Sequence, residues 1–146
     1  MWFVYALSAA VIWGVSYAAS GRAIERGIPP VLFFTLYAAV ATVMGLAALL
    51  ATGRLGMLFR IRGVIGDDWV WLVVAVVTSG VGALLIYLAI GEKNATLASL
   101  IEISYPLFVA FFAWAFFREV QFNAMTVLGA ALILSGVAVV YLANRA

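Results

Sequence analysis

The sequence has 146 residues, of which 68% are hydrophobic and only 10% are charged, whereas a soluble domain is about half apolar and a quarter charged. This composition predicts an all-α integral membrane protein and excludes an ordinary soluble domain. The absence of cysteine and histidine argues against disulfides, thiolate catalysis and a structural zinc site, so we expect no metal and no cofactor. The net charge of +2 comes from basic residues scattered singly over the loops, which predicts contact with lipid headgroups and no nucleic-acid-binding patch.

Apolar residues gather in windows of about 20 residues, the length that an α-helix needs to cross a hydrocarbon core about 30 Å thick. The windows cover residues 2–20, 30–52, 69–90, 95–117 and 124–142. We therefore expect a five-span transmembrane bundle in which residues 1–146 form one domain. The first window has no basic segment in front of it, which indicates a retained span rather than a cleaved signal peptide.

The basic residues of the loops divide equally between the two sides of the membrane that five spans define. One side holds Arg54, Arg60, Arg62 and Arg118, and the other holds Arg22, Arg26, Lys93 and Arg145. Orientation normally follows an excess of Lys and Arg in the cytoplasmic loops, and four residues against four leave no excess. The balance predicts that copies insert in both directions. Chance, or one misplaced span, is the alternative explanation.

One face of the first span carries polar and aromatic side chains. Trp13, Ser16, Tyr17 and Ser20 follow one another at helical spacing, so they lie on the same face. Gly14 beside them would allow another backbone to approach closely. The pattern is compatible with a polar path between helices and, equally, with routine helix packing.

Small residues in the third and fifth spans predict helix contacts. Gly80 lies in the sequence TSGVG in the middle of the third span, and Gly129 and Gly136 lie on one face of the fifth. Because lipid gives no hydrophobic driving force between helices, small residues that permit close approach mark helix interfaces. We expect these three glycines to serve helix packing.

The loop between the second and third windows, GRLGMLFRIRGVIGDD, mixes three arginines with large apolar side chains. Such a segment can lie in the membrane interface, with its apolar groups in the lipid and its arginines on anionic headgroups. Asp67 and Asp68 end this loop. We expect them to cap the following helix rather than to bind a metal.

The fourth span contains a carboxyl group and a proline. Counted from Ala95, Glu102 lies about 10 Å into the span and Pro106 about 16 Å. An ionised side chain at that depth costs about 3 kcal/mol on insertion scales, and protonating an ordinary carboxyl at pH 7 costs about 4 kcal/mol, so the surroundings decide the charge. Pro106 also lacks the N–H that would bond the carbonyl of Glu102. In lipid, both groups need partners in protein or in a water-filled cavity.

Ser99, Glu102, Tyr105 and Pro106 stack at helical spacing on one face of this span. We interpret that face as part of a substrate path, because acids within spans are costly and rarely face lipid. The alternative is a structural glutamate that is hydrogen-bonded to a neighbouring helix, with the proline as a plain kink.

The stretch ATLASLIEISYPLFVAFFAWAFFREV, followed by LGAALILSGVAVV, resembles the EamA family of the drug/metabolite transporter superfamily. Trp13 and Gly14 look like the family's early WG pair. The positions that look like the family's recurrent proline, glutamate and glycines are Pro106, Glu119, Gly129 and Gly136. The resemblance implies one half of a ten-helix, inverted-repeat transporter with a central cavity between its halves.

Two features depart from the family pattern. Arg118 stands where a glycine is usual before the glutamate, and the chain holds one five-span unit where most members carry two. Because one unit would form only half of the implied transporter, the second departure predicts a partner chain. The partner would be an antiparallel second copy or another EamA-like chain.

Together, the residues and the resemblance predict a transporter of a small organic solute, such as a metabolite, an amino acid or a drug, in the plasma or inner membrane and without enzyme activity. Glu102 would bind a cationic group or carry a proton, and Trp13 and Tyr17 would supply aromatic walls. Two alternatives stay open: a non-transporting membrane subunit that needs a different partner chain, and a lipid-carrier flippase. An intramembrane enzyme is the weakest hypothesis, because one buried acid comes with no nucleophile, base or metal set.

Overall fold

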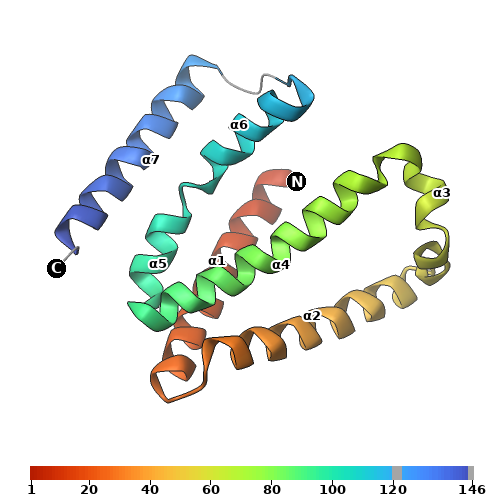
Figure 1. Cartoon of the computed structure of the whole chain (residues 1–146), viewed down its shortest axis with the longest axis horizontal. Coiled ribbons are helices and arrows are strands. Elements are labelled where there is room, and N and C mark those ends of the chain that lie inside the picture. The colour runs from red at the N-terminus through yellow and green to blue at the C-terminus, as the bar shows by residue number, and fades with distance from the viewer. Residues whose placement is uncertain (120–122, 145–146) are drawn as a thin grey trace. The chain divides into compact units, whose positions relative to one another are not determined.

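A computed structural model of the chain describes residues 1–119 and 123–144, and Arg145 of the charge count lies outside them. The described part is helical and has no strand (Figure 1). Its elements in chain order are α1 (Trp2–Glu25), α2 (Pro30–Ala51), the 3-10 helix η1 (Leu55–Phe59), α3 (Ile61–Ile65), the 3-10 helix η2 (Gly66–Asp68), α4 (Trp69–Glu92), α5 (Ala95–Glu102), α6 (Tyr105–Phe117) and α7 (Ala124–Ala143). Five helical segments in these residues are long and apolar enough to cross a membrane, so the predicted all-α, five-span fold class is confirmed.

The predicted spans agree with the helices to within two residues except at two places. α1 continues to Glu25 instead of ending at residue 20. The fourth span keeps its predicted outer bounds but is not one helix, because α5 ends at Glu102 and α6 begins at Tyr105 (Figure 1).

Pro106 explains why the fourth span breaks at this point. Its ring nitrogen has no hydrogen to donate to the carbonyl of Glu102. The chain turns instead: the N–H of Ser104 donates to the carbonyl of Ile101 at 3.2 Å, and the N–H of Leu107 donates to the carbonyl of Ser104 at 3.1 Å. Pro106 lies in the first turn of α6, where its missing N–H costs no hydrogen bond.

The chain divides into two compact units, and Ser20–Glu92 form one of them. In this unit α2 packs against α4. Tyr87 of α4 is fully buried, and its ring meets the rings of Phe33 and Tyr37 edge-on at centroid distances of 4.8 and 5.9 Å. The two helices are in tight contact at Gly91, where a Cβ atom would lie 2.8 Å from Cγ of Pro30.

The described residues of Met1–Ala19 and Lys93–Ala146 form the other unit, in which α5 packs against α7. Asparagines begin both helices: Oδ1 of Asn94 accepts the N–H of Leu97 at 2.8 Å, and Oδ1 of Asn123 accepts the N–H of Thr126 at 2.8 Å. Each bond satisfies one of the N–H groups that a helix start leaves without an intrahelical partner. The single domain over residues 1–146 stays a prediction.

Arg118 ends α6 in the left-handed region, with φ 59° and ψ 22°. This conformation is common one residue beyond a helix and favours glycine, because a Cβ atom is strained there. The geometry gives a physical reason why a glycine would suit the position at which the sequence departs from the family pattern. The Arg118 guanidinium lies over the ring of Trp114, 5.7 Å from its centroid.

Candidate functional site

A hydrogen bond joins Glu102 and Tyr17, two residues that the sequence analysis placed on different spans. The hydroxyl of Tyr17, from α1, donates to Oε2 of Glu102, at the end of α5, over 2.7 Å. Both side chains are half-buried. Since 85 positions separate the two residues, only the tertiary structure brings them together.

Glu102 lies directly before the break in the fourth span. It is the last residue of α5, and the C-terminal end of a helix carries partial negative charge, which disfavours an anion. α6 begins three residues later, and a helix start carries partial positive charge. Glu102 therefore stands at the edge of the break, and the Tyr17 hydroxyl supplies its carboxyl group with a hydrogen-bond donor.

Trp13 lies beside this pair on the same face of α1. Its ring centroid is 5.5 Å from that of Tyr17, at an interplanar angle of 42°, and 42% of the Trp13 side chain is exposed. An aromatic face near a carboxylate can bind a cation through its ring quadrupole. Trp13 therefore lies next to the tyrosine that bonds the acid, and its role as an aromatic wall stays a prediction.

Ser99, Tyr105 and Pro106 make different contacts from those of Glu102. The Ser99 hydroxyl donates to the carbonyl of Thr96 at 3.0 Å, within its own helix. Tyr105 begins α6 and is 60% exposed. Pro106 shapes the break through its backbone. The structure therefore brings Glu102, Tyr17 and Trp13 together and does not add Ser99 and Tyr105 to them. A role in a substrate path stays a prediction for all of these residues and for Pro106.

The glycines predicted to serve helix packing have open space around them. In the described part of the chain, no atom outside the local helix lies within 4 Å of the position of a Cβ atom at Gly14, Gly80, Gly129 or Gly136. Packing at these positions stays a prediction. The tight helix contact in Ser20–Glu92 is at Gly91 instead, which the sequence analysis did not single out.

Acidic residues do not cluster in the described residues: no group of three or more His, Cys, Asp or Glu side chains is placed to hold a metal ion. Asp67 and Asp68, considered as a metal pair and then as helix caps, form the 3-10 turn η2 in front of α4. The chemistry of the Glu102 site is accordingly that of one carboxyl, one phenol and one indole. Such a set can bind a cation or exchange a proton.

Five apolar spans with a hydrogen-bonded carboxyl at a break in one of them define a multi-span membrane protein with a polar site between helices. The model of the EamA-like transporter family matches residues 1–142, and the chain belongs to this family. The predicted resemblance is therefore confirmed, and the protein is a transporter-like membrane protein. No curated protein and no solved structure matched the chain.

Proposed function

We propose that the protein transports a small organic solute across the plasma or inner membrane, with Glu102 and Tyr17 in the solute path. The observation that carries the proposal is the 2.7 Å hydrogen bond between the Tyr17 hydroxyl and the Glu102 carboxyl at the break in the fourth span. Interrupted helices at mid-membrane are typical of transporter binding sites, where the freed backbone and nearby side chains contact the solute or the coupling ion.

The site can bind cargo by exchanging partners. A cationic group or a proton that reaches Glu102 competes with the Tyr17 hydroxyl for the carboxyl oxygens. Trp13, one turn earlier on α1, offers a ring face to the same cation. Binding therefore loosens the contact between α1 and α5, and release restores it. This exchange couples occupancy of the site to the relative position of two spans.

A second copy in the opposite orientation would complete the cavity. Two features support this part of the proposal: the loop charges are balanced at four against four, and α7 has no buried residue along its length. Two opposed copies would make in trans the inverted repeat that many transporters carry within one chain. Gly129 and Gly136 on α7 have open space and would form part of the contact.

The transport proposal is tested in proteoliposomes that contain the purified full chain. Uptake of radiolabelled amino acids and of organic cations such as tetraphenylphosphonium is measured with and without a pH gradient. Glu102→Gln should abolish the uptake that the native chain supports, because the neutral amide can neither neutralise a cation nor carry a proton. Glu92→Gln, at the end of α4, is the control for loss of one carboxyl and should transport normally. Equal uptake by both variants would remove Glu102 from the mechanism.

The orientation of the copies is tested separately by labelling. Because the chain has no cysteine, Ala146→Cys introduces a single reactive site, which is treated in intact cells with a membrane-impermeant maleimide before and after permeabilisation. Labelling of about half of the sites from outside is the result expected for two opposed orientations, by the balanced charge count. Labelling from one side alone would exclude the antiparallel homodimer and leave a different EamA-like partner or a non-transporting subunit.

A further inference from the structure

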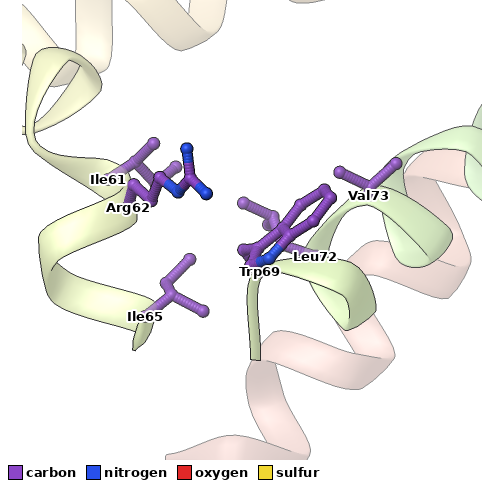
Figure 2. A pocket seen from close by; sticks show the side chains of 6 residues that line it. All are labelled: Ile61, Arg62, Ile65, Trp69, Leu72 and Val73. Carbon is purple, nitrogen blue, oxygen red and sulfur yellow. The ribbon is translucent and has the colours of Figure 1, made fainter. Parts of the chain in front are cut away.

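We propose that the pocket between α3 and the start of α4 binds one anionic phospholipid, with the phosphate on Arg62 and part of an acyl chain against the apolar walls. The pocket has a volume of about 260 Å³, and Ile61, Arg62, Ile65, Trp69, Leu72 and Val73 line it (Figure 2). It lies wholly within Ser20–Glu92, whereas Glu102 and Tyr17 belong to the other unit. The proposal therefore stands or falls independently of the transport site.

The lining combines one cationic group with apolar walls, as a site for an anionic lipid requires. Figure 2 shows Ile61, Arg62 and Ile65 on one wall, facing Trp69, Leu72 and Val73 on the other. One of these six side chains is charged and the rest are apolar. A free anion would make no use of the apolar walls, and an apolar solute would make no use of the guanidinium. An amphipathic anion uses both.

The Arg62 guanidinium has hydrogen-bond donors available for a phosphate. Its carbon Cζ lies 5.9 Å from the centroid of the Trp69 ring, which holds the group at the pocket without occupying its N–H groups. Asp67 and Asp68 follow closely in sequence, but within residues 1–119 and 123–144 neither forms an ion pair with Arg62. Arginine binds phosphate through paired, charge-assisted hydrogen bonds.

The pocket also lies at the depth where phospholipid headgroups are found. α2, with 22 residues, is about 33 Å long, enough to cross the hydrocarbon core, so the segment that follows it begins at the membrane surface. That segment exposes large apolar side chains, with Phe59 90% exposed, and these side chains need lipid to cover them. Arg54 and Arg60 add positive charge near Arg62, which attracts anionic lipid.

The size of the pocket favours a ligand that is only partly enclosed. Sites that surround a whole small molecule have volumes of about 300 to 1,000 Å³, and this pocket is slightly smaller. It holds a headgroup phosphate and a short segment of one acyl chain, while the rest of the lipid stays in the bilayer. A solute that had to be bound completely would find too little room.

The test is lipid binding to the delipidated, purified full chain in detergent. Phosphatidylglycerol and phosphatidylcholine with identical acyl chains are titrated separately, and native mass spectrometry counts the bound lipids. Both lipids carry a phosphate, but the choline cation of phosphatidylcholine offsets its charge and is repelled by Arg62. We therefore expect one phosphatidylglycerol to bind about tenfold more tightly than phosphatidylcholine. Arg62→Gln should abolish this preference. Arg54→Gln removes the same charge from the same loop, outside the pocket lining, and should change the affinity by no more than about twofold.

A second variant tests the apolar half without altering charge. Leu72→Trp fills part of the pocket and should weaken phosphatidylglycerol binding several-fold with Arg62 intact, which also keeps the proposal testable if Arg62→Gln fails to fold. Three results would overturn it: equal affinity for the two lipids, equal losses in Arg62→Gln and Arg54→Gln, or no effect of Leu72→Trp. Displacement of phosphatidylglycerol by inorganic phosphate would likewise replace the lipid site with a simple anion site.

Discussion

The hydrogen bond between Tyr17 and Glu102 makes a quantitative prediction about the stability of the protein. Its length of 2.7 Å suits a charge-assisted bond from a hydroxyl to a carboxylate, and hydrogen bonds to charged groups contribute about 1.5 to 3 kcal/mol. Neutral hydrogen bonds between membrane helices average only about 0.6 kcal/mol. The interaction energy of the pair therefore distinguishes an ionised Glu102 from a neutral one.

The assay is a double-mutant cycle on the free energy of unfolding, measured by titration with sodium dodecyl sulfate in mixed micelles. Tyr17→Phe removes the hydroxyl, Glu102→Met removes the carboxyl with little change in size, and the double variant completes the cycle. The cycle cancels the contact of Tyr17 with Trp13, so the coupling energy belongs to the pair. We expect a coupling of about 1.5 to 3 kcal/mol for the ionised form.

Glu102→Gln supplies the control, because an amide oxygen still accepts the hydroxyl but carries no charge. In the Glu102→Gln background, Tyr17→Phe should cost only about 0.6 kcal/mol. A coupling near zero in the Glu102→Met cycle would refute the reasoning, since it would mean that the hydrogen bond contributes nothing in the membrane-like environment. A coupling of only about 0.6 kcal/mol in the Glu102→Met cycle, equal to the cost of Tyr17→Phe in the Glu102→Gln background, would show that Glu102 is neutral.

The same unfolding assay checks three further predictions. Gly91→Ala should destabilise the protein by about 1 to 2 kcal/mol. The crowding against Pro30 at 2.8 Å costs about 1 to 3 kcal/mol, and the gain in helix propensity offsets at most about 1 kcal/mol of it. Gly80→Ala, at a position with open space, should be neutral or stabilising. Asn94→Ala should lower the free energy of unfolding by about 1 kcal/mol, because it removes the cap of α5. Asn94→Asp should keep most of that stability, because its carboxylate oxygen still accepts the hydrogen bond from the Leu97 N–H. Arg118→Gly should be more stable than Arg118→Ala by about 1 kcal/mol, because both lose the contact with Trp114 and only glycine relieves the left-handed strain; equal stability would contradict the assigned conformation.

The spans and the two halves of the site could be predicted from the sequence. Length and hydropathy suffice for the spans, because a helix in lipid must satisfy its own backbone hydrogen bonds over a fixed thickness. Glu102 stands out because an acid in an apolar window is costly, and Tyr17 stands out because helical spacing places it on a polar face. Each signal is local, so each can be obtained without knowing the fold.

The contacts between helices could not be predicted in this way. The bond from Tyr17 to Glu102 depends on how α1 lies against α5, and no local pattern fixes that arrangement. Tyr87 is the only tyrosine of its span and looks like any interfacial aromatic residue, yet it is fully buried. Gly91 looked less significant than Gly80, because small residues at mid-span suggested packing, whereas close approach occurs near the end of α4.

The effect of Pro106 could be predicted only in part. Its position showed that the carbonyl of Glu102 loses a hydrogen bond, which is a local fact. Whether the helix bends or stops depends on the turn that Ile103 and Ser104 adopt, and the structure shows that it stops. Arg118 is a second case of this kind. The sequence showed where the helix ends, but not that Arg118 adopts the left-handed conformation there.

The broken fourth span also bears on the surroundings that the proposed site requires. Non-helical backbone at membrane depth is tolerated only where it is buried in protein or lines a water-filled cavity, because lipid cannot bond the freed polar groups. Around the break Ile103 and Tyr105 are 52% and 60% exposed, so the unit that contains the break does not itself cover the turn. The freed backbone groups of the turn therefore require water or further protein as partners, which is the condition that a solute path of the proposed kind would meet.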